Sequence, residues 1–247
     1  MGRQGGGGGL VNRNRPIAVL AALDIEAATL ASNLPRSDAT SPNLPIWEGV
    51  LESEPVVLVV AGMGKVAAAM AAQFVVDVFR PLALISMGLA GGVGEPGERG
   101  RLIVATGAVQ HDFDARPLTN KKGVLPGLGV TTLVADHVVA ERLRIAALKV
   151  VERAQIVVSG VVLTGDQIVT SRDVRDRLLG DFPDGACFDM ETAAVAQVAH
   201  QNQVPWGALR ITSDSADETF NLHEVLGFGA DSAAELFDRV IVRFLRG

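Results

Sequence analysis

Acidic side chains stand at three places where a predicted strand gives way to a helix or a turn. Glu26 follows the apolar run PIAVLAAL, Glu191 begins the Ala/Val-rich run ETAAVAQVA, and Asp214 follows the apolar run PWGALRIT. A carboxylate in a pocket can bind hydroxyl groups of a ligand or transfer a proton. Because ligands in open α/β sheets bind beyond the carboxyl ends of the strands, each of these acids is a candidate site residue.

The same acids also have an interpretation that needs no ligand. Asp189 would suit the N-cap of a helix, and Glu26 and Glu191 would suit first helical turns, where the helix dipole favours negative charge. Asp214 could cap the turn that follows its strand. Arg210 argues for more than capping, because an arginine within an apolar strand needs an acidic partner or a ligand.

Two glycine-rich segments could bring the backbone close to a ligand. Gly62 and Gly64 fit the G-x-G-x-x-A form of a dinucleotide fingerprint, but the next strand ends ISMGLAGG, without the acid that the fingerprint requires. The second glycine-rich segment is SMGLAGGV. It carries Leu89 at a position where a phosphate-binding site would have a hydroxyl or a cationic side chain. The sequence therefore favours tight turns over a dinucleotide or phosphate cradle.

Composition argues against several classes of protein. A net charge of −6 and a pI near 5.2 disfavour a nucleic-acid partner. No segment is long and apolar enough to predict a membrane span. The four histidines lack metal-ligand spacing with one another or with Cys187, so no metal is expected. A single cysteine cannot form an internal disulfide, which predicts a cytoplasmic location.

Strand-like and helical segments alternate along the chain from residue 16 to residue 247, with no linker long enough to divide it. This pattern predicts one α/β domain, a three-layer sandwich whose central mixed, largely parallel twisted sheet is flanked by helices. Residues 1–15 include five consecutive glycines, and we expect a disordered leader there. The predicted strands are 16–23, 45–52, 55–62, 82–88, 101–110, 154–163, 166–171 and 205–212, and the predicted helices are 24–34, 65–79, 134–151, 172–180, 187–200 and 232–245.

Four segments together resemble the nucleoside phosphorylase/nucleosidase superfamily, in particular the 5′-methylthioadenosine/S-adenosylhomocysteine nucleosidases. They are AALDIEAATL, AGMGKVAAAMA, TGDQIVTS and FDMETAAVAQVAHQNQVPWGALRITSDSAD, and their order and spacing fit along essentially the whole folded chain. The resemblance implies a nucleoside phosphorylase-like fold. It also implies an enzyme that hydrolyses the N-glycosidic bond of an adenine thionucleoside, such as 5′-methylthioadenosine or S-adenosylhomocysteine, and releases adenine in methionine salvage. No metal or redox cofactor is required.

The resemblance also implies a division of roles among the three acids. Asp214 would be the general acid that protonates N7 of adenine, Glu26 would hold or activate the attacking water, and Glu191 would bind the ribose hydroxyls. Asp214 can donate a proton near neutral pH only if its pKa is raised. An anionic Glu191 would stabilise the positive charge that develops on the sugar. Glycosidases likewise assign different catalytic roles to two carboxyl groups.

Other contacts follow from the same resemblance. Met190 would pack against the sugar, Arg210 would steady the carboxylates, and Met63 would line the side of the sulfur substituent. The remaining substrate-binding residues that the resemblance implies are Leu89, Ile168, Val169 and Ser213.

The long predicted loop at residues 111–129 resembles the family's dimer-exchange loop. Leu118 and Pro126 would complete the pocket of a neighbouring subunit, which implies a homodimer. Two positions depart from the family pattern. Leu89 replaces the serine of GSAGG, and Ile168 replaces the phenylalanine of GDAFI that stacks on the base. These departures bear on which nucleoside is preferred, and not on which bond is broken.

Two other functions compete with hydrolysis. A related enzyme could cleave a purine nucleoside, or another adenosine-bearing metabolite, with phosphate in place of water. Leu89 and a first strand-to-helix turn without arginine argue against a phosphate site. A non-catalytic nucleotide-binding module built on Gly62 and Gly64 would leave the three acids without a role.

Overall fold

The computed structural model describes residues 15–37, 44–93, 99–153 and 156–247. The expected leader, residues 1–15, lies outside the described part apart from Arg15. The strands are β1 (Ile17–Ala21), β2 (Ile46–Leu51), β3 (Glu54–Val60), β4 (Ala83–Gly92), β5 (Leu102–Gln110), β6 (Leu133–Val134), β7 (Val157–Thr164), β8 (Gly185–Asp189) and β9 (Trp206–Asp214). The helices are α1 (Asp24–Ser32), α2 (Lys65–Phe79), α3 (His137–Val150), α4 (Arg172–Asp181), α5 (Thr192–Gln201), α6 (Leu222–Phe228), the π-helical turn η2 (Gly229–Ala233) and α7 (Ala234–Arg246).

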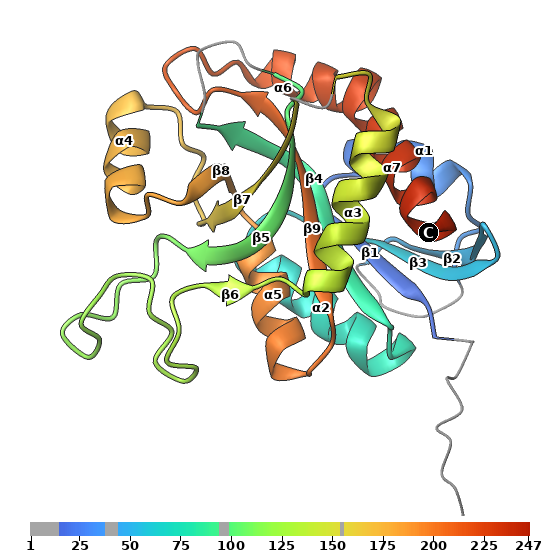
Figure 1. Cartoon of the computed structure of the whole chain (residues 1–247), viewed down its shortest axis with the longest axis horizontal. Helices are drawn as coiled ribbons and strands as arrows, with labels where there is room; N and C mark the ends of the chain where they lie inside the picture. Colours follow the sequence, from blue (N-terminus) through green and yellow to red (C-terminus); the bar gives the residue numbers. More distant parts are fainter. Residues whose placement is uncertain (1–14, 38–43, 94–98, 154–155) are drawn as a thin grey trace, which may run out of the picture.

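A single mixed sheet forms the centre of the fold (Figure 1), as the sequence predicts. Its order is β2-β3-β1-β4-β8-β7-β5-β6, and β9 pairs with both β4 and β5. The pairings of β1 with β3 and β4, of β4 with β9, and of β7 with β5 and β8 are parallel. The remaining pairings, β2 with β3, β4 with β8, and β5 with β6 and β9, are antiparallel.

The pairings close into a ring of five strands, which the sequence did not predict. β4 pairs with β8, β8 with β7, β7 with β5, β5 with β9, and β9 again with β4. At the end of β4, Gly91 is therefore in register with Phe188 on one side and with Asp214 on the other. The ring brings the ends of β4, β8 and β9 to one place.

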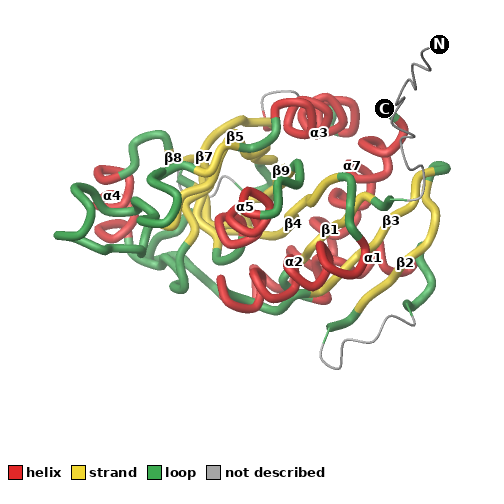
Figure 2. The backbone as a smooth tube through the Cα atoms, turned by 90° about the horizontal axis from the view of Figure 1, so that it is seen from below, coloured by secondary structure: helices red, strands yellow, loops and turns green. Residues whose placement is uncertain are grey.

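Two helical layers cover the sheet, which confirms the predicted sandwich (Figures 1 and 2). On one face α2 packs against α5, and on the other α7 packs against α1 and α3. The fully buried β1 contributes to both layers, because successive side chains of a strand point to opposite faces. Ala18 and Leu20 join the core with α2 and α5, and Ile17 and Val19 join the core with α1, α3 and α7.

The prediction of one helix over residues 187–200 is wrong. Gly185–Asp189 forms β8, which pairs with β7 and β4, and α5 begins only at Thr192. The apolar residues before the acids belong to the sheet, so Asp189 ends a strand and is not a helix N-cap residue. Its carboxylate still accepts the N–H of Thr192 at 2.9 Å, which is the contact that a cap would make.

The predicted strand over residues 166–171 is also wrong, because this segment is a loop. Asp166 is hydrogen-bonded to the start of α2 and to a neighbouring loop instead of to a strand. Its Oδ1 accepts the N–H of Lys65 at 2.8 Å, and its own N–H donates to Asp112 Oδ2 at 2.9 Å. The loop that follows carries Ile168 and Val169.

Two boundaries also differ from the prediction. β4 continues past residue 88 to Gly92, and residues 94–98 of the expected glycine turn lie outside the described residues. α3 begins at His137 because Asp136 caps it, accepting the N–H of Val139 at 3.0 Å. The sequence did not predict α6 or η2.

Candidate active site

A cavity of about 360 Å³ opens where the ends of β4, β8 and β9 meet the first turn of α1. Loop 167–169 and α6 contribute to its wall. Nine of the residues predicted from the sequence line it: Glu26, Met63, Leu89, Ile168, Val169, Met190, Glu191, Ser213 and Asp214. The three acids, which are far apart along the chain, therefore share one pocket.

Glu26 is 3% exposed and is fixed by three backbone donors. Its Oε2 accepts the N–H of Ala22 at 3.0 Å and of Leu23 at 2.9 Å, and its Oε1 accepts the N–H of Leu89 at 2.8 Å. Burial raises the pKa of this carboxyl, while the three N–H groups and the charge of Arg210 oppose the rise. Leu89 contributes through its backbone, so the lack of a hydroxyl at this position does not remove the bond to Glu26.

Glu191 is 7% exposed and directly precedes α5. Its Oε1 accepts the N–H of Gly64 at 2.9 Å. Gly64 has a φ of +94°, a conformation that favours glycine, so this residue type allows the turn to aim its N–H at the carboxylate. Burial and, next, the charge of Asp189 raise the pKa of Glu191 to about 7. The glycine-rich turn therefore holds an acid of the site.

Asp214 lies at the end of β9, with its carboxyl group held on both oxygens. Oδ1 accepts the N–H of Ala216 and Oδ2 accepts the hydroxyl of Ser213, each at 2.8 Å. Burial raises the pKa of Asp214 against the effect of these two bonds. A carboxyl group with a raised pKa, lining a cavity, has the character of a general acid.

Arg210 does not line the cavity but lies behind it, where it is 1% exposed. Its Nη2 makes a 2.7 Å ion pair with Asp189 Oδ2 and donates to Ser86 Oγ at 2.7 Å. Its Nε donates to Thr192 Oγ1 at 3.0 Å, and Thr164 donates to the other Asp189 oxygen at 2.5 Å. The acidic partner that a buried arginine requires is therefore Asp189.

Because Gly88 has no side chain, the guanidinium of Arg210 can lie close to the carboxylate of Glu26. A Cβ at Gly88 would collide with Arg210 Nη1 and would lie 2.9 Å from Glu26 Oε1. Nη1 is buried and has no hydrogen-bond partner among the described residues. The guanidinium therefore lies near Glu26 across position 88, and its charge lowers the pKa of that carboxyl.

Sequence reasoning missed several residues of the site. The sequence predicts a helix-cap role for Asp189, although the need of Arg210 for an acidic partner is a signal that points to this residue. The apolar residues before and within α6 carry no sequence signal of a role in the site, because the sequence predicts no helix there. The missed residues that line the cavity include Gln167, Phe188, Phe220, Leu222, Val225 and Leu226.

Leu118 and Pro126 lie outside the cavity of their own chain. Both are exposed, Leu118 to 88%. The start of their loop is tied to the first residue of α2, because Lys65 Nζ lies 2.5 Å from Asp112 Oδ1.

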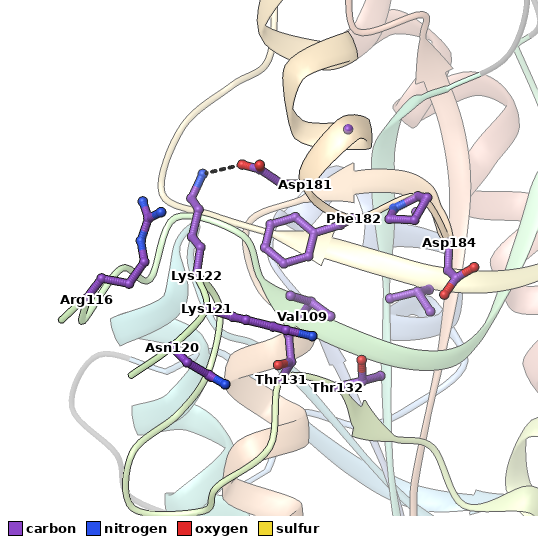
Figure 3. A pocket seen from close by; sticks show the side chains of 14 residues that line it. Val109, Arg116, Asn120, Lys121, Lys122, Thr131, Thr132, Asp181, Phe182 and Asp184 are labelled. Atoms are coloured by element: carbon purple, nitrogen blue, oxygen red, sulfur yellow. Dashed lines mark hydrogen bonds and ion pairs between the residues drawn. The ribbon is translucent and has the colours of Figure 1, made fainter. Parts of the chain in front are cut away.

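A second cavity, of about 540 Å³, lies between this loop and the end of α4 (Figure 3). Lys122 and Asp181 face one another there with 3.3 Å between Nζ and Oδ2, and Phe182 lies beside them. No sequence-predicted site residue lines this cavity. It is larger than the first, but it lacks the three acids.

Two kinds of feature are absent from the part of the chain that the structure describes. Its His, Cys, Asp and Glu side chains form no group of three or more that could hold a metal ion. Its helices include none long and apolar enough to cross a membrane.

Comparisons with known proteins identify the family to which the chain is similar. The model of the phosphorylase superfamily matches residues 16–246. The 5′-methylthioadenosine/S-adenosylhomocysteine nucleosidase of Glaesserella parasuis is 33% identical, over 77% of this chain and 82% of its own. That of Anoxybacillus flavithermus is 32% identical, over 83% and 88%. The structure of the Neisseria meningitidis enzyme, in complex with methylthio-immucillin-A, superposes with a TM-score of 0.86 at 27% identity, covering 94% of this chain and 99% of the other.

Proposed function

The chain belongs to the phosphorylase superfamily and, within it, to the 5′-methylthioadenosine/S-adenosylhomocysteine nucleosidases, and we propose from this that it hydrolyses the N-glycosidic bond of an adenine nucleoside. The expected substrates are 5′-methylthioadenosine, S-adenosylhomocysteine or a close analogue, and the expected product is adenine, in methionine salvage. The observation that carries the proposal is the meeting of Glu26, Glu191 and Asp214 around one cavity.

Asp214 would donate a proton to N7 of the departing base. Adenine leaves poorly as an anion, and protonation in the transition state removes that charge. The raised pKa of the Asp214 carboxyl supports this role, because the group can then carry a proton closer to neutral pH. Ser213, which donates to Asp214 Oδ2, would orient the acid.

Glu26 would hold the attacking water on the opposite side of the sugar. Its three backbone bonds fix the carboxylate without using its full acceptor capacity, since two carboxylate oxygens offer about four lone-pair sites. The charge of Arg210, which lies behind the cavity, opposes the rise in the pKa of Glu26 and so favours the anionic form that would accept a hydrogen bond from the water.

Glu191 would bind the ribose hydroxyls and stabilise the cationic sugar in the transition state. It must be anionic to do both, and the buried Arg210 lowers its pKa against burial. Met190 lines the same side of the cavity and would pack on the sugar ring. Asp189 and Arg210 would act through these groups as positioning residues.

Water is a better candidate than phosphate for the nucleophile. The described residues that line the cavity include no lysine and no arginine, whereas an inorganic phosphate would need cationic donors. A dinucleotide-binding module is equally disfavoured, since the N–H of Gly64 already donates to Glu191. Hydrolysis, in contrast, gives a role to each of Glu26, Glu191 and Asp214.

We further propose a homodimer in which loop 111–129 reaches the neighbouring pocket. The 88% exposure of Leu118 supports this proposal, because a large apolar side chain at a loop tip gains from burial in a partner. Leu118 and Pro126 would then complete the subsite for the 5′ substituent. A cytoplasmic location is proposed from the single, buried Cys187.

The test is to incubate the protein with 5′-methylthioadenosine, with and without inorganic phosphate, and to separate the base and sugar products. Release of adenine at the same rate in both samples is the expected result. A strict requirement for phosphate, with formation of a sugar 1-phosphate, would overturn hydrolysis. Absence of turnover on all adenine nucleosides would overturn the assignment of the base.

A further inference from the structure

Helix α2 begins directly after Met63, a residue of the cavity wall, and has no cap of its own. Its N-cap residue is Gly64, which has no side chain to accept a backbone N–H, and no acid lies in its first turn. The first N–H groups of a helix have no partner within the helix, and the helix dipole favours negative charge near them. An acceptor for these groups must therefore come from outside the helix.

Asp166 supplies this acceptor from a distant loop. Its Oδ1 accepts the N–H of Lys65, the first residue of α2, at 2.8 Å. A Cβ at Gly64 would lie only 3.2 Å from the same oxygen, so glycine at this position lets the carboxylate approach the turn. The N–H of Gly64 donates to Glu191 Oε1 at 2.9 Å. Two consecutive N–H groups of one turn therefore bind two acids, and one of these acids lines the cavity.

Lys65 and Asp112 hold Asp166 in place. Asp112 Oδ2 accepts the N–H of Asp166 at 2.9 Å, and Asp112 Oδ1 lies 2.5 Å from Lys65 Nζ. Burial raises the pKa of Asp112, but the hydrogen bonds from Lys65 and from the N–H of Asp166 outweigh burial and keep this pKa below its ordinary value. Asp112 is therefore anionic at neutral pH. The three residues form a closed cycle that joins the start of α2 to two loops.

The ion pair between Lys65 and Asp166 is the weaker part of this cycle. Lys65 Nζ lies 3.7 Å from Asp166 Oδ2, the Asp166 side chain is 48% exposed, and exposed pairs contribute little. The bond to the backbone of Lys65 matters more for the site. The N–H groups of Gly64 and Lys65 belong to neighbouring planar peptide groups, and a glycine between such groups rotates more freely than other residues. A bond that holds one of these groups therefore limits the rotation of the other.

We infer that Asp166 is a positioning residue for Glu191. By binding the N–H of Lys65, it holds the turn whose preceding N–H, that of Gly64, is bound to the Glu191 carboxylate. Asp166 does not line the cavity, so it acts through this turn. The inference rests on the proposed function, in which Glu191 binds the ribose hydroxyls as an anion.

The test is the pH dependence of kcat/KM for 5′-methylthioadenosine in Asp166→Ala. Burial raises the pKa of Glu191 and the N–H of Gly64 lowers it, so a turn that no longer aims this N–H makes Glu191 harder to ionise. Because a hydrogen bond to a charged group is lost, the acidic limb of the profile should move about one pH unit higher. Loss of the Asp166 charge by itself would lower the pKa of Glu191, so the two explanations predict opposite shifts.

Asp166→Asn tests whether the bond to the backbone is responsible. Asparagine keeps an oxygen that can accept the N–H of Lys65 but has no charge. The acidic limb of this variant should therefore show no rise above that of the wild type.

Asp136→Ala is the matched control. Asp136 caps α3 by accepting the N–H of Val139 at 3.0 Å, and it does not line the cavity. The control removes a helix cap of the same kind and should leave the pH profile unchanged. A rise confined to Asp166→Ala supports the inference. An unchanged profile in Asp166→Ala, or an equal rise in Asp166→Asn or in Asp136→Ala, overturns it.

Failure of the proposed function is recognised separately, because the wild-type chain would then cleave no adenine nucleoside. Hydrogen exchange at the N–H of Gly64, followed by NMR, still reports in that case whether Asp166 holds the turn. Exchange should be faster in Asp166→Ala than in the wild type and unchanged in Asp136→Ala. Equal exchange in the wild type and in Asp166→Ala overturns the inference whether or not the chain is active.

Discussion

The two ends of the cavity are built in opposite ways. At the inner end, Glu26, Glu191 and Arg210 are buried and hydrogen-bonded, so their positions are set before substrate arrives. At the outer end, Met63, Ile168 and Leu222 are more than half exposed, at 59%, 54% and 54%. This chain therefore fixes the groups that we propose to break the bond and leaves exposed the surface that we propose to meet the 5′ substituent.

The largest effect is expected at the inner end, from Asp214→Asn. The variant keeps the shape of the side chain but has no acidic proton, and loss of a general acid typically costs 10²- to 10⁴-fold in rate. We expect kcat for 5′-methylthioadenosine to fall by about that factor, with an unchanged circular dichroism spectrum. Activity near that of the wild type would show that another group protonates the base.

Asp189→Asn should break the network that supports this end. It leaves the charge of Arg210 buried without its ion-pair partner, which typically costs about 3–5 kcal/mol. Denaturant unfolding should show that loss of stability. Glu141→Gln is the control, because Glu141 and Arg144 form an exposed ion pair on α3, and exposed pairs contribute about 1 kcal/mol or less. An equal loss in the free energy of unfolding in the two variants would contradict a stabilising role for the buried ion pair at the inner end.

Glu191→Gln should change how stability depends on pH. The pKa of Glu191 is raised in the folded chain from 4.5 to about 7, so its contribution to stability is fully present below pH 4.5 and is lost as the pH rises to 7. Glutamine does not titrate and can still accept the N–H of Gly64. The free energy of unfolding of the variant, relative to the wild type, should therefore increase by about 3 kcal/mol between pH 4.5 and pH 8. A difference that does not vary over this range would show that Glu191 is not perturbed.

The smallest effects on stability are expected at the outer end. Met63→Ala and Leu226→Ala should raise KM for 5′-methylthioadenosine by up to about tenfold with little change in kcat, since both would contact a part of the substrate that does not react. Their free energies of unfolding should stay within about 0.5 kcal/mol of the wild type. Val138→Ala, an exposed apolar residue on α3, should change neither quantity. A fall in kcat would mean that the outer end also positions the reacting atoms.

Sequence analysis was most successful where local pattern and burial agree. The helix at residues 65–79 and the strands ending at Ala21 and Asp214 follow from continuous apolar runs, and the acids that follow such strands proved to line the cavity. The prediction was wrong at residues 166–171, where a segment with the β-branched residues Ile168 and Val169 forms a loop held by the hydrogen bonds of Asp166. The ion pair of Asp189 with Arg210 was not predicted, because its partners meet only after the five-strand ring has formed.

The proposed hydrolysis is tested most directly by turnover of 5′-methylthioadenosine in ¹⁸O-labelled water with inorganic phosphate present. If water held by Glu26 is the nucleophile, the released sugar carries one ¹⁸O atom at its anomeric carbon, and no sugar 1-phosphate forms. An unlabelled sugar 1-phosphate as the product would contradict the account.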